Sequence, residues 1–257
     1  MRNIRIVVQI DRINYFSDIW LKYYTTFFKS ENFIFLFEER FIDCEVFKNY
    51  LNDYNIDSEL CTLFPLQNIP YDASERMGYM TTYMINFVSE ILDGNTVVIY
   101  PDVDELIYHE NLIELLQTFE TNFLVTNPID IIQKIGEEVE YISEKKLFEQ
   151  RTFCLNNDNP ISKWYKKNIV VKSKPDWKNG RHMEAETTED LYLIHLGKFD
   201  FEFLKKINLQ NLSMYENQQI NQNGIIDNEL YNWYLNQVNE LTKIPEELLR
   251  RLQMLGI

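Results

Sequence analysis

The sequence has little glycine, proline or cysteine and no long hydrophobic run. Seven glycines and seven prolines among 257 residues exclude collagen-like and low-complexity chains. Its three cysteines, Cys44, Cys61 and Cys154, are too few and too scattered for a disulfide scaffold or a zinc ribbon. No stretch approaches the roughly 20 apolar residues of a transmembrane helix. We therefore expect a cytoplasmic protein without a transmembrane segment, and peripheral membrane association stays open.

Basic residues are also scarce. The chain has 25 Lys and Arg against 40 Asp and Glu, which gives a formal net charge of −15. Such a chain is not expected to bind the phosphates of a nucleic acid or an anionic bilayer non-specifically. Hydrophobic residues make up 45% of the chain and aromatic residues 14%, which is enough for a packed core. The composition predicts a globular protein with no nucleic-acid partner.

Strand and helix signals alternate in the first half of the chain. Strands are predicted at residues 4–10, 33–37, 59–64, 96–100 and 122–126, and helices at 13–28, 47–54, 72–93 and 111–119. Repeated β-α-β units favour a mainly parallel sheet with helices on both faces. Neither G-x-G-x-x-G nor G-x-x-x-x-G-K-[ST] is present, which disfavours a standard dinucleotide site and a P-loop.

The second half has shorter signals. Strands are predicted at residues 139–142, 148–154, 169–171 and 191–194, and helices at 229–238 and 246–254. We predict an α/β catalytic domain over residues 1–205. A helical C-terminal extension over residues 206–257 is expected to pack on the same domain.

Three carboxylates follow the apolar strand that ends at Tyr100, in the sequence Pro-Asp-Val-Asp-Glu. In an open α/β sheet, ligands bind beyond the carboxyl ends of the strands. Asp102 and Asp104 are two residues apart, so they lie on the same side of an extended chain. Two carboxylates on one side suit Mg²⁺ or Mn²⁺. The alternative is a polar strand-to-helix turn in which an aspartate caps the next helix.

A second apolar strand ends at His195, in the sequence His-Leu-Gly-Lys. Imidazole is a good third ligand for Mn²⁺ beside two carboxylates. Gly197 would let the backbone approach a phosphate, and Lys198 would neutralise that phosphate. The alternative is a structural histidine that lies away from the carboxylates.

Basic residues are concentrated between Lys163 and Arg181, where Asp176 is the single acidic residue. A cationic segment in an anionic protein can attract an anionic ligand. The alternative is a solvated, lysine-rich strand edge that blocks aggregation.

The residues from Val97 to Ile107 resemble the D-x-D-E metal motif of GT-A-fold nucleotide-sugar glycosyltransferases, in particular family-2-like and family-92-like members. Those enzymes also have a later strand that ends in histidine, as here at His195. The resemblance covers about residues 4–205. It implies a GT-A-like α/β fold, which is a mainly parallel central sheet flanked by helices, with a mixed β region and a C-terminal helical tail.

This resemblance also implies a function. A divalent cation, Mn²⁺ or Mg²⁺, would bridge the diphosphate of a nucleoside-diphosphate sugar, and the sugar would pass to a glycan or glycoconjugate acceptor. The implied metal ligands are Asp102, Asp104 and His195, and the implied contacts to the nucleotide are Asp11, Arg12, Glu38, Arg76, Lys198 and the two aspartates.

Two further points stay open in the sequence. An inverting enzyme needs a carboxylate base on the acceptor hydroxyl, and the candidates are Glu184, Glu186, Asp130 and Asp190. Asp11 has the alternative role of capping the first helix.

Two other functions compete with the transferase. A haloacid-dehalogenase-like phosphatase also places D-x-D after an apolar strand, with the first aspartate as nucleophile and the second as acid. Glu105-Leu106 after the motif, and the lack of a later paired-aspartate motif, disfavour this class. The third candidate is a non-catalytic protein that binds sugar nucleotides.

Overall fold

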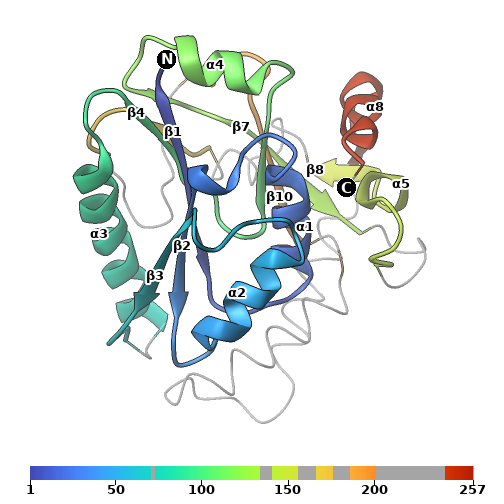
Figure 1. Cartoon of the computed structure of the whole chain (residues 1–257). Coiled ribbons are helices and arrows are strands. Elements are labelled where there is room, and N and C mark those ends of the chain that lie inside the picture. The colour runs from blue at the N-terminus through green and yellow to red at the C-terminus, as the bar shows by residue number, and fades with distance from the viewer. Residues whose placement is uncertain are drawn as a thin grey trace.

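The chain folds into two β-sheets with helices packed around them (Figure 1). The structure, a computed structural model, describes residues 1–70, 73–133, 141–155, 166–175, 186–198, 200 and 241–256, with only the backbone at 73, 74, 77 and 198. The predicted α/β class with helix-flanked sheets is confirmed. None of the described helices is both long enough and apolar enough to cross a membrane.

The first sheet is mainly parallel. Its strands, in spatial order, are β3 (Thr62–Leu66), β2 (Phe33–Glu38), β1 (Asn3–Ile10), β4 (Thr96–Ile99), β9 (Val170–Val171) and β6 (Phe123–Leu124). The first four are parallel, and β9 is antiparallel to both of its neighbours. The carboxyl ends of β1, β2 and β4 therefore meet at one edge of the sheet, where ligands bind in folds of this class.

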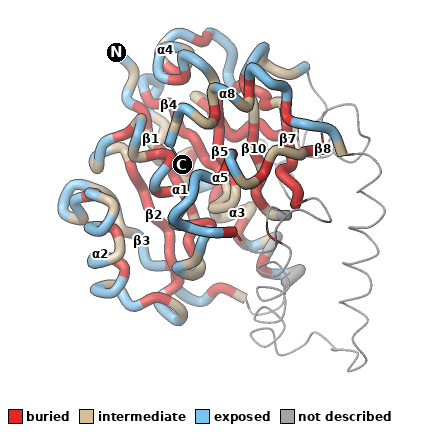
Figure 2. Tube along the Cα trace, turned by 90° about the vertical axis from the view of Figure 1, so that its right-hand side faces the viewer, coloured by how far each residue is buried: buried red, intermediate tan, exposed pale blue. Residues whose placement is uncertain are grey.

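Helices cover both faces of this sheet. The helices are α1 (Tyr15–Tyr24), α2 (Cys44–Asn52) and α3 (Ala73–Ile91). Alternate residues of β1 point to opposite faces, so Ile6 and Val8 join the core under α1 and α2, and Val7 joins the core under α3. Figure 1 shows α3 on one side of β1–β3 and the other two helices on the opposite side. Figure 2 shows that strands β1, β2 and β4 are largely buried.

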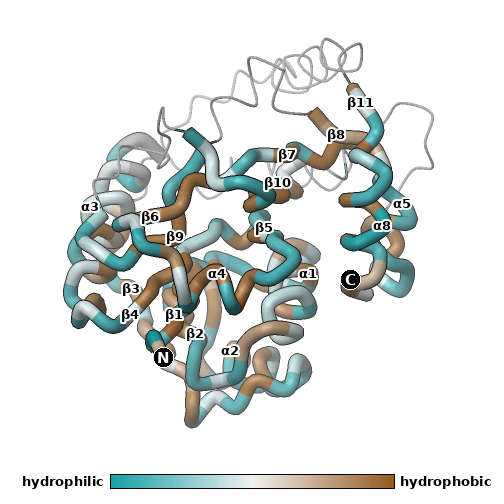
Figure 3. Tube along the Cα trace, turned by 90° about the horizontal axis from the view of Figure 1, so that it is seen from above, coloured by the Kyte–Doolittle hydropathy of each residue, from teal (hydrophilic) through white to brown (hydrophobic). Residues whose placement is uncertain are grey.

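The second sheet is mixed. Its strands, in spatial order, are β11 (Thr242–Lys243), β8 (Phe153–Leu155), β7 (Asn127–Ile132), β10 (Tyr192–Lys198) and β5 (Glu105–Tyr108). Strand β10 is parallel to β7 and antiparallel to β5. Two helices, α5 (Leu147–Gln150) and α8 (Glu246–Met254), lie together at the β8–β11 end of this sheet (Figure 3).

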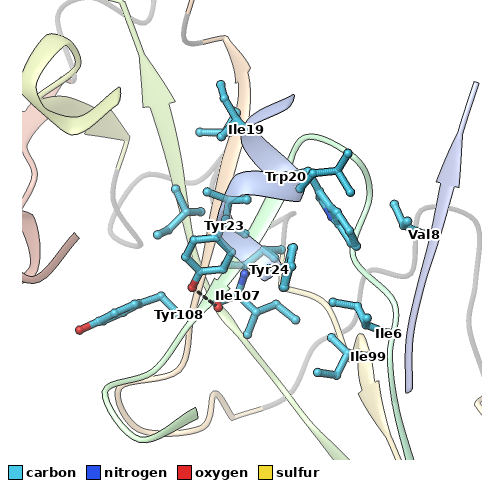
Figure 4. Close-up of a cluster of buried hydrophobic side chains, with 14 of the residues drawn as sticks. Ile6, Val8, Ile19, Trp20, Tyr23, Tyr24, Ile99, Ile107 and Tyr108 are labelled. Atoms are coloured by element: carbon cyan, nitrogen blue, oxygen red, sulfur yellow. Dashed lines mark hydrogen bonds between the residues drawn. The ribbon is translucent and has the colours of Figure 1, made fainter. Parts of the chain in front are cut away.

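Helix α1 joins the two sheets. Its Trp20 is fully buried and packs on Phe33 of β2, while Tyr23 and Tyr24 reach β5 on the other side. The Tyr23 hydroxyl donates to the carbonyl of Ile107 at 2.5 Å (Figure 4). The Tyr24 hydroxyl donates to the carbonyl of Glu105 at 3.2 Å and accepts from the Ile107 amide at 2.9 Å. Residues of both sheets therefore share one apolar core around α1.

Several predicted elements differ from the observed ones. Residues 105–108 and 127–132 form strands β5 and β7, which were not predicted. The predicted strand at 148–154 is instead the end of α5 followed by β8. Helix α8 has the predicted bounds, and Pro245 is its N-cap. The shorter elements are η1 (Ser30–Asn32) and α4 (Leu112–Thr118).

The C-terminal residues that the structure describes pack on the main body. Strand β11 pairs with β8, and Leu248 and Leu252 of α8 lie in the main core. The predicted helix at 229–238 and the start of the helix at Asp72 lie outside the described residues. The division into residues 1–205 and 206–257 stays a prediction.

Candidate functional site

The carboxylates after β4 form a tight turn that leads into β5. The Asp102 amide donates to Oε2 of Glu105 at 2.9 Å, and the Glu105 amide donates to the Asp102 carbonyl at 3.0 Å. Glu105 is fully buried, whereas the Asp102 side chain is 42% exposed. No helix begins here, so the alternative of a helix-capping aspartate is wrong. The turn presents Asp102 and Asp104 at the carboxyl edge of the first sheet.

His195 reaches this turn from β10. In the two strand pairings of β10, His195 lies opposite Glu105 on β5 and opposite Asp130 on β7. Its Nε2 is 3.3 Å from Oδ2 of Asp104, and its Nδ1 is 2.5 Å from Oδ1 of Asp130. The predicted proximity of His195 to Asp104 is confirmed. Strand β10, which carries His195, pairs with β5 and β7, whereas β4, which precedes the two aspartates, lies in the other sheet.

The charge state of His195 follows from these two contacts. Burial by itself lowers the pKa of the imidazole. The negative charges of Asp104 and Asp130, and the hydrogen bonds to them, raise this pKa by more, so it lies well above its usual value. The two carboxylates thus favour the protonated imidazolium form of His195 over the neutral form.

Gly197 leaves space beside this group. A Cβ atom at this position would lie 3.0 Å from Cε1 of His195 and 3.2 Å from Oδ2 of Asp104. Such contacts are tighter than ordinary van der Waals packing. The missing side chain therefore keeps open the space where the imidazole and the carboxylate face each other.

Lys167 supplies a second cation at the turn. Its Nζ is 2.9 Å from Oδ2 of Asp102 and also forms an ion pair with Oε1 of Glu105. One lysine of the predicted cationic segment, Lys167, therefore lies in the site. Another, Lys172, donates instead to the carbonyls of Phe119 and Glu120 at the far side of β9.

Carboxylates outnumber basic side chains in this cluster. Asp102 and Glu105 share Lys167, and Asp104 and Asp130 share His195. Four carboxylates thus contact two basic side chains among these six described residues. Such an acidic group suits a cation better than an anion.

Two of the three predicted metal ligands fit such a cation. Asp104 and His195 are adjacent, partly exposed and of suitable donor type. The second ring nitrogen of His195 is held by a carboxylate, which is the usual arrangement of a metal-bound histidine. No group of three His, Cys, Asp or Glu side chains with metal-binding geometry occurs in the described part of the chain. Asp102 is paired with Lys167 and would complete the set only after leaving it.

A second ionic cluster lies at the ends of β1 and β2. Arg76 of α3 pairs with Asp11, whose Oδ2 is 2.8 Å away, and with Glu38. Arg40 also binds Glu38, at 2.5 Å, and Gln9 donates to Oδ1 of Asp11 at 2.6 Å. Arg76 and Glu38 are buried and bind each other, which disfavours the predicted direct contact of either with a nucleotide. Asp11, whose side chain is 36% exposed, is the more accessible of the two carboxylates in the cluster.

The structure gives the remaining predicted residues other positions or roles. Asn14, and not Asp11, caps α1, and Arg12 lies in the bend between them. Asp130 is only 1% exposed and faces His195, a position that favours orienting the imidazole over acting as base on an acceptor. Glu186 is exposed and, among the described residues, makes no hydrogen bond or ion pair with the carboxylate turn.

The last three predicted site residues are Asp190, Glu184 and Lys198. Asp190 is exposed and accepts from the Tyr192 hydroxyl at 3.4 Å, at the start of β10. Glu184 and the side chain of Lys198 lie outside the described residues.

Among known proteins, solved structures match this chain. No protein-family model and no curated protein matches it. Among solved structures, one from Bacillus anthracis, described as a glucose-1-phosphate thymidylyltransferase in complex with a sucrose, is 11% identical to this chain. The match covers 98% of this chain and 95% of that one, with a TM-score of 0.28. A TM-score this low carries no argument about fold or function.

Proposed function

We propose that the chain is a metal-dependent glycosyltransferase that moves a sugar from a nucleoside-diphosphate sugar to a hydroxyl acceptor such as a glycan. The observation that supports this most is the contact of Asp104 with His195, whose other nitrogen is held by Asp130. The group lies at the carboxyl edge of the first sheet, next to the strand ends that carry Asp11 and Glu38. This combination suits a diphosphate and its counter-cation better than it suits a neutral ligand.

In this proposal Asp104 and His195 hold the cation, and Asp102 joins them. When bound, a divalent cation neutralises the negative charge that develops on a diphosphate as the sugar leaves. Asp130 holds Nδ1 of His195 and so keeps Nε2 directed at Asp104. Asp130 is thus a positioning residue in this account.

The nucleoside would bind at the ends of β1 and β2. Asp11 is the exposed acceptor there, and Arg76 fixes its carboxylate from the side of α3. A carboxylate in this position can accept from a base N–H or a ribose hydroxyl. Glu184, Glu186 and Asp190 remain the candidates for a base on the acceptor hydroxyl.

A thermal-shift screen tests this function. UDP-, GDP-, CMP- and dTDP-sugars would be added with and without Mn²⁺, to the unsubstituted protein and to Asp104→Asn. We expect one nucleotide class to raise the melting temperature only with Mn²⁺. A ligand at 100 times its Kd stabilises the folded state by about 2.7 kcal/mol. Asp104→Asn is expected to lose this stabilisation, and no shift with any sugar nucleotide would contradict the proposal.

The same protein preparations separate the competing functions. If the protein hydrolyses phosphate monoesters and beryllofluoride inhibits this activity, the protein is the phosphatase. Binding of a sugar nucleotide without turnover would indicate the non-catalytic protein.

A further inference from the structure

Lys167 is shared unequally by two carboxylates. It is 5% exposed, and one of its partners, Glu105, is fully buried. Its other partner, Asp102, has a side chain that is 42% exposed. Removing the cation from a buried carboxylate strongly destabilises the folded protein, whereas water solvates an exposed carboxylate that loses its cation. The pair with Glu105 is therefore the fixed anchor of Lys167, and the pair with Asp102 is the one that can be exchanged.

The backbone around Lys167 is held firmly against the site. Three residues after it, Val170 of β9 pairs with Ile99 at the end of β4. The Tyr100 amide donates to the carbonyl of Ile169 at 2.7 Å, and the Thr126 amide donates to the carbonyl of Lys167 at 3.1 Å. The ammonium group is thus held at the carboxylate turn by the segment that leads into β9, the strand beside β4.

We propose that Lys167 is a diphosphate-binding residue that gives up Asp102 when substrate binds. In the free protein its ammonium group neutralises Asp102 and so competes with a divalent cation for that carboxylate. In the loaded protein Asp102 turns to the cation, and Lys167 stays with Glu105 and donates to an anionic phosphate oxygen. This inference rests on the proposed function, because it names a further residue of the same site.

If Lys167 exchanges partners in this way, replacing it should change the affinities for Mn²⁺ and for pyrophosphate in opposite directions. Removing the ammonium group in Lys167→Met frees Asp102, so Mn²⁺ alone is expected to bind about tenfold tighter. Inorganic pyrophosphate loses a charge-assisted hydrogen bond and is expected to bind about tenfold more weakly. A merely structural lysine would lower the melting temperature without moving the two affinities in opposite directions.

Calorimetry on four proteins tests this. They are the unsubstituted chain, Lys167→Met, the double variant Glu105→Gln/Lys167→Met, and Lys172→Met. The double variant removes the buried charge together with its cation, so it keeps the test valid if Lys167→Met does not fold. Lys172→Met removes a lysine of the same segment whose ammonium group binds two backbone carbonyls, and it is expected to leave both affinities unchanged.

The outcomes separate this proposal from the proposed function. Tighter Mn²⁺ binding with weaker pyrophosphate binding supports the exchange. Equal or weaker Mn²⁺ binding in both Lys167 variants overturns it. If the unsubstituted chain binds no Mn²⁺, the metal-dependent function fails, and pyrophosphate titrated without metal then decides the role of Lys167. Absence of pyrophosphate binding, or equal binding to the variants, overturns that role as well.

Discussion

His195 and Asp130 face each other across the parallel strands β10 and β7, with Nδ1 of the imidazole 2.5 Å from Oδ1 of the carboxylate. The two residues are 65 positions apart in the chain. Because the Asp130 carboxylate accepts a hydrogen bond from Nδ1–H, this contact directs Nε2 toward Asp104. The pairing of two strands thus sets the direction in which the histidine can bind a ligand.

Replacing Asp130 should weaken metal binding without removing any ligand. We expect Asp130→Asn to raise the Kd for Mn²⁺ about 10–100-fold, because a carboxylate that orients a ligating histidine has an effect of that size. Titration calorimetry measures the change, and the control is Asp190→Asn, an exposed aspartate just before β10, the strand that carries His195. An unchanged Kd in Asp130→Asn would mean that His195 does not bind the metal.

Adding one methyl group beside the imidazole should have a similar effect. In Gly197→Ala the new Cβ would lie 3.0 Å from Cε1 of His195 and 3.2 Å from Oδ2 of Asp104. Both groups must shift, so we expect weaker Mn²⁺ binding with little loss of fold. Gly78→Ala is the matched control, since a Cβ there has nothing within 4 Å apart from its chain neighbours and the backbone of its own helix.

Gly78→Ala is itself expected to change the stability of the protein. Gly78 lies within α3, where alanine is favoured over glycine by about 1 kcal/mol. Urea unfolding should therefore show that Gly78→Ala is more stable than the unsubstituted protein. A gain in stability together with unchanged Mn²⁺ binding would show that the effect at Gly197 is local. Equal loss of Mn²⁺ binding in both variants would contradict that account.

Tyr24→Phe tests how α1 holds the strand after the carboxylate turn. The hydroxyl group bonds to the Glu105 carbonyl and the Ile107 amide, and all of these atoms are buried. Leaving a buried backbone group without its partner costs about 1–3 kcal/mol. Urea unfolding should show a loss of this size. Tyr79→Phe, at an exposed position of α3, should show almost none, and equal effects would contradict the role of Tyr24.

Arg76→Met tests the ionic cluster at the ends of β1 and β2. The change leaves buried Glu38 with Arg40 as its remaining ion-pair partner among the described residues. Breaking a buried ion pair on one side costs about 3–5 kcal/mol, and we expect a loss of roughly 3 kcal/mol in urea unfolding because Arg40 remains. Arg250→Met, in an exposed pair with Glu247, is the control and should change little. Equal stability of Arg76→Met and the unsubstituted protein would contradict a structural role for Arg76.

Local sequence patterns predicted much of the first sheet. Apolar runs located β1, β2 and β4, and the run Glu246–Met254 located α8 with its observed bounds. These elements form where hydrophobic period and end signals agree, and both are readable within a short window. The carboxylate turn was found in the same way, because a polar cluster follows a buried strand.

Local sequence patterns could not predict the second sheet, or the residues that contact the carboxylates and His195. The chain passes from β6 in the first sheet to β7 in the second within residues 124–127, with no helix between them. Asp130 lies in β7, and Lys167 lies 65 residues from Asp102. Their places depend on which strands pair and in what register, which no local pattern specifies.

Pulsed electron paramagnetic resonance of bound Mn²⁺ tests the central claim most directly, because it detects a nitrogen atom bound to the metal. In the unsubstituted protein we expect one Mn²⁺ ion whose spectrum shows coupling to a nitrogen nucleus. We expect His195→Ala to lose this coupling and Asp104→Asn to lose most of the bound Mn²⁺. Bound Mn²⁺ without nitrogen coupling, or with a coupling that persists in His195→Ala, would contradict the account.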